Sequence, residues 1–343
     1  MTFPRATLRI DLGALAANYR AFRDLTGVEV AASVKADAYG LGVEAVAERL
    51  FAEGCRAFLV ATVEEGAGLR RIVGSEATIY VLNGPMGGME ACVAAGLVPV
   101  LSSPEMVAAW ESRSGPCALM FDTGMNRLGL AADVELPDLN VALVMSHLAC
   151  ADTQAHPMND EQRQRAEAVF ERFPDTRKSL ANSAGIYLGE AYHFDQVRPG
   201  IGLYGGSVTD APDVEVTRPV VSLEAPVLQV REVKVGETVG YDATFTARRD
   251  MMVGVAGIGY ADGLPVALSN AKGVAGFRGA DVDIVGRVSM DLTCVDLRGH
   301  DAGVGDVITF YGPRLAAAAR AARTIDYELL TRCGSRLQRV YSR

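Results

Sequence analysis

Residues 30–42 read VAASVKADAYGLG, an apolar run that stops abruptly at Lys35. Glycines follow and a helical pattern resumes at Val43, so the stretch predicts a buried strand, a tight loop and a helix start. A lysine at the exit of such a strand lies near a buried sheet, where desolvation favours the neutral amine and its use as a nucleophile or base. The plain alternative is a strand-end lysine that extends its charge into solvent.

The segments after this stretch alternate between strand and helix. Apolar runs predict buried strands near residues 28–34, 56–60, 77–82, 97–101, 116–121, 141–147, 178–182 and 194–198. A helix capped by Asp11 precedes them, and segments with helical spacing lie between most of them, at residues 44–51, 63–72, 105–110 and 161–170. Eight strands alternating with helices over roughly 200 residues is the count of a TIM barrel, with a doubly wound open sheet as the alternative.

The alternation stops at about residue 215. Short apolar runs between glycine-rich turns follow and predict strands near residues 220–230, 232–239, 252–258, 282–285, 292–297 and 307–310. Residues 315–330 predict an amphipathic helix. We therefore expect an α/β fold, a TIM (β/α)8 barrel over residues 10–215, followed by a mostly β domain over residues 216–343 that includes the N-terminal strand, residues 1–9.

The composition is that of an ordinary soluble globular protein, with 343 residues, 49% hydrophobic and 22% charged. The net charge of -9 argues against a nucleic-acid partner but allows a small anionic ligand at a local cation. No Cys-x-x-Cys pair occurs, and Cys150, Asp152, His156 and Asp160 fit no metal-ligand spacing, so we expect neither disulfides nor a metal site. Without a signal core or a transmembrane stretch, we expect a cytoplasmic protein with no membrane contact.

Polar residues stand where five of the predicted strands end. They are Lys35, Arg127, His147, Asn182 with Ser183, and Arg198. Because the functional side chains of a TIM barrel lie at the C-terminal ends of its strands, these residues predict a site at that mouth of the barrel.

Two segments at the last two predicted strands are suited to hold a phosphate group, NSAG over residues 182–185 and RPGIGLYG over residues 198–205. Glycine lets backbone N–H groups approach a phosphate, and the Ser183 hydroxyl adds a donor. Gly200, Gly202 and Gly205 also match the Gly-x-Gly-x-x-Gly dinucleotide pattern. Turn residues follow where that pattern needs a helix, which argues against a dinucleotide site.

The sequence VKADAYG over residues 34–40 resembles the cofactor-lysine signature of the alanine racemase family, whose lysine forms a Schiff base with pyridoxal 5'-phosphate (PLP). The resemblance extends over nearly the whole chain, through DTGMNRLG (122–129), SH (146–147), RPGI (198–201), GY (240–241), GYADG (259–263) and GRVSMD (286–291). It implies a PLP-dependent enzyme that interconverts L- and D-alanine, either to supply D-alanine for cell-wall peptidoglycan or to degrade it.

The resemblance also implies a role for each site residue. Lys35 carries the cofactor, Tyr241 is the second base, and Arg198 faces the pyridine nitrogen. The phosphate is held by Tyr39, Ser183, Gly200 and Ile201, with Asn182 as a further candidate beside Ser183. Arg127 and Met290 receive the carboxylate of a small amino-acid substrate. In the family, Tyr241 and Met290 complete the site of the other subunit of a homodimer.

These roles agree with the chemistry of racemisation, which removes the α-proton from one face of the substrate and returns a proton to the other. A free tyrosine ionises near pH 10, so Tyr241 needs a polar network to become basic, for which His147 linked to Arg198 is the candidate. A guanidinium cannot accept the ring proton. Arg198 therefore leaves the pyridine largely unprotonated, which disfavours transamination.

Two positions depart from the family pattern. Many members have a lysine, often carbamylated, two residues before the aspartate of the DTGM motif, where this chain has Met120. Arg127 must therefore be oriented otherwise, by Asn126, an anion or water. Some members have a phosphate-contacting tyrosine near the C-terminus, where this chain has Ser335.

Three alternative functions remain. One is a racemase of broader specificity or a serine racemase, because the pocket walls cannot be read from the sequence. Another is a non-catalytic PLP-binding barrel protein, against which residues 216–343 and Tyr241 argue. A decarboxylase of the same fold is disfavoured, because it is expected to place an acidic residue where this chain has Arg198.

Overall fold

The computed structural model describes residues 5–113, 115–210 and 217–343. They divide into two compact units. One unit spans Leu15–Arg218, and the other combines the described residues up to Ala14 with Pro219–Arg343. The predicted domain boundary at residues 215 and 216 lies outside the described residues.

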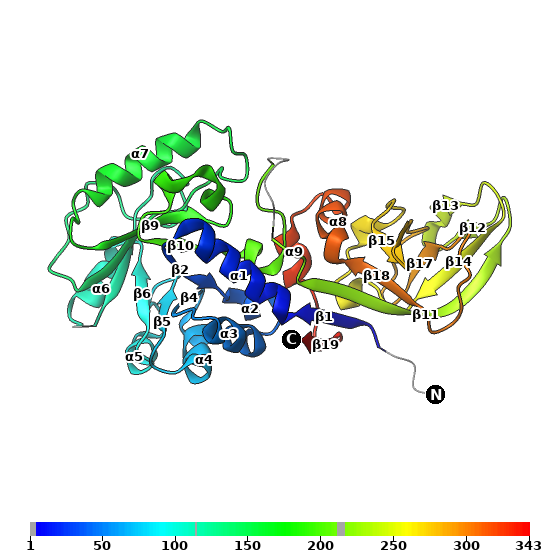
Figure 1. The fold of residues 1–343 in the computed structure, drawn as a ribbon, viewed down its shortest axis with the longest axis horizontal. Helices are drawn as coiled ribbons and strands as arrows, with labels where there is room; N and C mark the ends of the chain where they lie inside the picture. The colour runs from blue at the N-terminus through cyan, green and yellow to red at the C-terminus, as the bar shows by residue number, and fades with distance from the viewer. Residues whose placement is uncertain (1–4, 114, 211–216) are drawn as a thin grey trace. The chain divides into compact units, whose positions relative to one another are not determined.

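The unit that spans Leu15–Arg218 is a barrel of parallel strands with helices around them (Figure 1). Its strands are β2 (Glu29–Val30), β3 (Ala32–Ser33), β4 (Ala57–Val60), β5 (Thr78–Val81), β6 (Val98–Leu101), β7 (Cys117–Met120), β8 (Val141–Met145), β9 (Arg177–Asn182) and β10 (Gln196–Arg198). The sheet order is β2-β10-β9-β8-β7-β6-β5-β4-β3. Because β2 and β3 are separated only by Ala31 and pair with β10 and β4, the sheet nearly closes on itself. The predicted TIM barrel is confirmed, and its first strand is divided at Ala31.

Helices fill most of the connections between barrel strands. They are α3 (Val43–Ala52), α4 (Val63–Val73), α5 (Met89–Ala94), α6 (Pro104–Glu111) and α7 (Met158–Phe170), and α1 (Leu12–Thr26) precedes the first barrel strand. Polar side chains cap the N-termini of α1, α4 and α6; at α1, Asp11 Oδ1 accepts from the Ala14 N–H at 2.8 Å. The short helix α5 was not predicted, because its six residues are too few to show a helical period. Among the described residues, no helix combines the length and the apolar character needed to cross a lipid bilayer.

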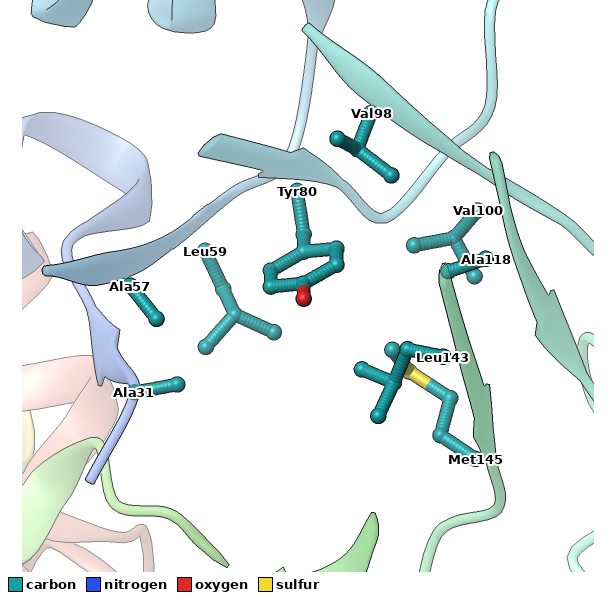
Figure 2. Packing of buried hydrophobic residues seen from close by; sticks show 9 residues of the cluster. All are labelled: Ala31, Ala57, Leu59, Tyr80, Val98, Val100, Ala118, Leu143 and Met145. Carbon is teal, nitrogen blue, oxygen red and sulfur yellow. The ribbon is translucent and has the colours of Figure 1, made fainter. Parts of the chain in front are cut away.

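The interior of the barrel is filled by inward-facing side chains of neighbouring strands. Figure 2 shows them turned toward one another, with the Tyr80 hydroxyl among them. The buried cluster consists of Ala31, Ala57, Leu59, Tyr80, Val98, Val100, Ala118, Leu143 and Met145. Removing such apolar surface from water contributes about 25 cal/mol per Å². A filled interior leaves the mouth of the barrel, and not its centre, as the place for a site.

The other unit is mostly β, as predicted, and is built on the long strand β11 (Val221–Val233). The first part of β11 pairs with β1 (Thr7–Asp11) and β18 (Val307–Tyr311), and its second part pairs with β14 (Met251–Ala256). The remaining strands are β12 (Thr238–Val239), β13 (Phe245–Thr246), β15 (Ala275–Phe277), β16 (Ala280–Val282), β17 (Thr293–Asp296) and β19 (Gln338–Ser342). A second buried cluster contains Val233, Val239, Ala247, Met251, Val253 and Val285.

Two predicted element boundaries in this unit are wrong. The sequence predicts a break near Arg231, but β11 continues to Val233, because exposed charged residues occupy its solvent side while Val233 returns to the interior. The predicted helix over residues 315–330 is two helices, α8 (Leu315–Ala322) and α9 (Asp326–Thr331). Arg323 adopts a left-handed conformation (φ 53°) and ends α8.

Candidate active site

The lysine-bearing stretch forms a left-handed turn directly after β3. Ala36, Asp37, Ala38 and Tyr39 have φ values of 53°, 56°, 52° and 58°. For a residue with a side chain, this conformation costs roughly 1–2 kcal/mol of conformational free energy. Backbone strain of this kind clusters at functional sites. The strand end and the tight loop agree with the prediction. The left-handed conformation was not predicted, because none of the four residues is a glycine.

Side chains from neighbouring segments hold this turn in place. Asp37 Oδ1 accepts from the Val43 N–H at 2.7 Å, which ties the turn to the start of α3. The N–H of Ala36 donates to Glu65 on α4 at 2.8 Å. Lys35 therefore projects from a backbone that is fixed by hydrogen bonds on both sides.

Lys35 is half-buried, and its proton affinity depends on nearby charges. Burial lowers its pKa, the positive charge of Arg127 lowers it further, and the negative charge of Glu65 raises it in part. The net direction is downward, so more of the amine is neutral at a given pH than in an exposed lysine. A neutral amine is the form that acts as a nucleophile or base.

Arg127 lies in the loop that connects β7 to β8. Asp122 Oδ1 accepts from the Gly124 N–H at 2.8 Å and from the Asn126 N–H at 3.1 Å, which folds the loop so that Arg127 is exposed at its tip. Met120 packs against the buried cluster of the barrel. The loop that carries Arg127 is thus shaped by Asp122, and the methionine that replaces the family lysine belongs to the core.

Arg198 is buried at the end of β10 and is held by a set of acceptors. Its guanidinium donates to the Ser179 hydroxyl, to the Ser146 carbonyl and, at 3.2 Å, to the Leu180 carbonyl. Its Nη2 also lies 3.4 Å from His147 Nδ1. Burial lowers the pKa of Arg198 to about 10, so the group remains a cation near neutral pH.

His147 is neutral in this environment. Burial, followed by the charges of Arg198, Arg127 and Lys35, lowers its pKa to about 3. Because the Arg198 guanidinium can only donate, the contact makes Nδ1 the acceptor and assigns the ring hydrogen to Nε2. The imidazole therefore has one N–H to offer to another acceptor.

The two glycine-containing segments meet at Ser183 and form a cradle around its hydroxyl. Ser183 Oγ accepts from the Gly200 N–H at 2.8 Å and from the Gly202 N–H at 3.2 Å, so its own hydrogen can be donated outward. A Cβ at Gly200 would lie 2.2 Å from Tyr39 Oη, which explains the glycine. The buried Ile201 opens the short helix η3 (Ile201–Tyr204) directly after it.

Asn182, at the end of β9, has a different part in this region. Its Oδ1 accepts from the Gly185 N–H at 2.8 Å and so fixes the segment that follows β9. This contact makes Asn182 a support of the loop next to Ser183.

Tyr241 and Met290 belong to the other unit, whereas the remaining predicted site residues gather at the ends of the barrel strands. Both side chains are exposed, Tyr241 by 70% and Met290 by 53%. Tyr241 opens the short helix η4 (Tyr241–Ala243), next to an ion pair between Asp242 and Arg287. Large side chains exposed to this degree are available to another surface.

The contacts of several residues that shape the site were not predicted, although two of these residues stand in segments singled out from the sequence. Ser179, Ser146 and Tyr204 lie within buried segments, where single polar groups are hidden in an apolar run. The Tyr204 hydroxyl donates to the Ser33 carbonyl at 2.7 Å and joins η3 to β3. The sequence did contain a signal for Glu65, because this residue stands three positions after Thr62, which is the spacing of a helix-capping pattern.

The arrangement matches the class of PLP-binding TIM-barrel enzymes. The cofactor requires a lysine for its aldehyde, donors for its phosphate and a partner for its pyridine nitrogen. Lys35, the Ser183 cradle and Arg198 supply these three groups from the ends of β3, β9 and β10. The Tyr39 hydroxyl packs closely against Gly200 and so lies at the same cradle.

Comparisons with known proteins define the family. The chain matches the family models "Alanine racemase, N-terminal domain" over residues 10–208 and "Alanine racemase, C-terminal domain" over residues 220–341. It is 43% identical to an alanine racemase of Rhodospirillum rubrum, covering 98% of this chain and 96% of that protein. It is 44% identical to a biosynthetic alanine racemase of Agrobacterium fabrum, covering 99% of this chain and 95% of that protein.

A solved structure gives the same result. The crystal structure of alanine racemase from Bartonella henselae with covalently bound pyridoxal phosphate is similar with a TM-score of 0.90 and 35% identity, covering 99% of this chain and all of that one (100%). The chain therefore belongs to the alanine racemase family, and the resemblance stated from the sequence is confirmed.

Proposed function

We propose that this chain is a PLP-dependent racemase that interconverts L- and D-alanine, with Lys35 and Tyr241 as its two acid/base groups. The observation that carries the proposal is Lys35 at the barrel mouth, on a strained turn and with its pKa lowered by burial and by Arg127. The family to which the chain belongs supports alanine as the substrate and PLP as the cofactor.

PLP, when bound, withdraws electrons from the substrate and makes its α-hydrogen acidic. Lys35 would hold the cofactor aldehyde, and the phosphate would lie against Ser183, Gly200, Ile201 and Tyr39. The hydrogen bonds that the Gly200 and Gly202 N–H groups donate to Ser183 Oγ orient the hydroxyl of this serine, so that it can donate its own hydrogen to the phosphate.

Arg198 would face the pyridine nitrogen. Because its pKa is about 10, it keeps its own protons near neutral pH and acts only as a hydrogen-bond donor. The contacts with Ser179 and with the Ser146 and Leu180 carbonyls keep the guanidinium in one place. A donor that does not transfer its proton limits the electron withdrawal by the ring, which favours racemisation over transamination.

The α-proton is moved by one group on each face of the substrate. Lys35 takes or returns it on one face and Tyr241 does so on the other. A tyrosine acts as a base when a donor stabilises its ionised form. The Nε2–H of neutral His147, backed by Arg198 at 3.4 Å from Nδ1, is suited to that purpose.

The substrate carboxylate would be bound by Arg127 and Met290. Arg127 is exposed at the tip of its loop, and its charge acts on both Lys35 and His147. A guanidinium binds a carboxylate through two parallel hydrogen bonds, which fixes the orientation of the substrate.

A homodimer would complete each site with Tyr241 and Met290 of the other subunit. The strong exposure of both side chains supports this arrangement. The β-rich domain, residues 216–343 with the N-terminal strand, would then be the part that delivers the second base.

We place the enzyme in the cytoplasm, in agreement with cysteines that are unpaired in the described structure.

The test is chiral analysis of the product that forms from L-alanine. Purified full-length chain with PLP should convert L-alanine to an equal mixture of both enantiomers, and Lys35→Ala should not. L-serine in the same assay tests the broader specificity. If PLP binds and neither amino acid is racemised, the proposed activity is wrong, and a non-catalytic PLP-binding protein becomes the better description.

A further inference from the structure

Glu65 is a half-buried carboxylate next to Lys35 that has no role in the mechanism above. It is the third residue of α4, and its N–H donates to the Thr62 side chain at 3.3 Å, which caps the helix. In a capping box the carboxylate at this position turns back to the backbone N–H of the capping residue itself. The sequence alone therefore predicts only a helix cap.

The structure gives the carboxylate different partners. Glu65 Oε2 accepts from the Ala61 N–H at 2.7 Å, one residue before the cap. Its Oε1 accepts from the Ala36 N–H at 2.8 Å, on a segment 29 positions away in the chain. One side chain thus joins the end of β4 to the turn that follows β3.

The contact falls at a sensitive point of the left-handed turn. Ala36 directly follows Lys35 and is the first of the four residues with positive φ. A hydrogen bond to a charged acceptor is among the stronger ones in proteins. The carboxylate therefore stabilises the turn at the residue that directly follows Lys35.

Glu65 also balances the charges that face Lys35. Arg127 makes the amine less basic and Glu65 makes it more basic, while His147 is neutral. Without the carboxylate, only positive charge would act on the amine. A nearby carboxylate stabilises the protonated form of such a base and so limits how far its pKa falls.

We propose that Glu65 is a positioning residue for Lys35, which fixes the start of the turn through Ala36 and places a negative charge beside the amine. The proposal rests on the function proposed above for Lys35. It separates two tasks of one side chain, a hydrogen bond to Ala36 and a charge near the amine, and each task can be measured without turnover.

Hydrogen exchange tests the first task in the full chain loaded with PLP. In Glu65→Ala, the Ala36 amide hydrogen should exchange with solvent at least about tenfold faster, because a charge-assisted hydrogen bond is lost. The exchange is measured on the peptide that contains Ala36. Glu64→Gln is the matched control, since Glu64 precedes Glu65 on the same helix and is exposed. The control should exchange like the unsubstituted chain.

Competitive acetylation across a pH series tests the second task in the full chain freed of PLP. Glu65→Gln removes the charge but retains an acceptor oxygen, so Lys35 should become reactive at lower pH, with the exposed Lys272 as internal reference. In Glu64→Gln the curve for Lys35 should not move. Unchanged exchange at Ala36 in Glu65→Ala, or an unchanged acetylation curve in Glu65→Gln, overturns the proposal.

The two readouts distinguish a failure of the role proposed for Glu65 from a failure of the proposed activity. If both readouts shift as expected in a chain that does not racemise alanine, the role of Glu65 stands and the proposed activity falls. If the chain racemises alanine and either readout is unaffected, the activity stands and the role of Glu65 falls.

Discussion

Lys35, Arg127, His147 and Arg198 place four basic side chains at one mouth of the barrel, where burial and the charges of Arg198, Arg127 and Lys35 act on His147 and the charge of Arg127 acts on Lys35. The pKa of Lys35 is lowered, that of His147 falls to about 3, and that of Arg198 falls to about 10. The positive charge of the Arg127 and Arg198 guanidinium groups attracts anions. It suits a site that binds a phosphate and an amino-acid carboxylate together.

The neutral state of His147 predicts how stability changes in acid. Its pKa of about 3 in the fold lies below the value of about 6.5 in an unfolded chain, so between these values the unfolded chain binds the proton first. The free energy of unfolding should therefore fall as the pH drops from 6.5 toward 3. We expect the urea midpoint to decline less steeply from pH 7 to pH 4 in His147→Gln. The exposed His156 is the control, and His156→Gln should decline like the unsubstituted chain.

Equal declines in His147→Gln and in the unsubstituted chain would show that His147 is not held neutral by the fold.

Removal of Arg127 should affect substrate binding and the basicity of Lys35 together. In Arg127→Gln, kcat/KM for alanine should fall by about 10–100-fold, the range for a lost hydrogen bond to a charged group. Lys35 should also titrate at higher pH in the chain freed of PLP, because a positive charge that lowers its pKa is gone. Steady-state kinetics and the acetylation series measure the two effects. Arg113→Gln, at an exposed ion pair with Glu90, should leave both unchanged.

A fall in PLP affinity in place of a rise in KM would assign Arg127 to the cofactor and not to the substrate.

At the scale of elements, the barrel could be predicted because each buried strand and each amphipathic helix has its own period in the sequence. The order of polar residues after the strands also placed Lys35, Ser183 and Arg198 at the correct ends. The left-handed turn could not be predicted, because its cost is offset by distant partners such as Glu65. The break of the last helix at Arg323 likewise has no local signal, since arginine is a good helix former.

The phosphate cradle should not tolerate a side chain at Gly200. In Gly200→Ala the new Cβ would lie 2.2 Å from the Tyr39 hydroxyl, in a region where both residues are buried. We expect destabilisation by about 1–3 kcal/mol and weaker PLP binding, measured by thermal unfolding and by absorbance titration. Gly68→Ala is the control, because its Cβ would come no closer than 3.9 Å to another atom and lies within helix α4. The control should bind PLP normally and be equally or slightly more stable.

Normal PLP binding by Gly200→Ala would exclude residues 198–205 as part of the phosphate site.

At the scale of the whole molecule, the residues assigned to the proposed function belong to two compact units. The barrel unit carries Lys35, the cradle and the arginines, while Tyr241 and Met290 stand exposed on the β-rich unit. Sequence periodicity predicted the two units but contains no information on how subunits meet. The proposed exchange of Tyr241 between subunits comes from the family resemblance and is open to a direct test.

Mixing two inactive variants should restore activity if Tyr241 acts on the partner's barrel. In a mixed dimer of Lys35→Ala and Tyr241→Phe, one of the two sites has an intact lysine and an intact tyrosine. Random assembly should therefore return roughly a quarter of the unsubstituted activity. A mixture of Lys35→Ala with Arg127→Gln should show no such rescue, because both changes lie in the barrel unit. An inactive first mixture in which mixed dimers have been isolated would contradict the exchange.

Exchange of the α-proton in D2O decides whether Lys35 and Tyr241 serve opposite faces of the substrate. The PLP-loaded chain is given L-alanine and D-alanine separately, and proton NMR and chiral analysis follow both. The unsubstituted chain should exchange the α-hydrogen of each enantiomer and interconvert them. Tyr241→Phe should exchange only the enantiomer that Lys35 serves, without interconversion. If Tyr241→Phe interconverts both enantiomers at the unsubstituted rate, Tyr241 is not the second base and the two-base mechanism is wrong.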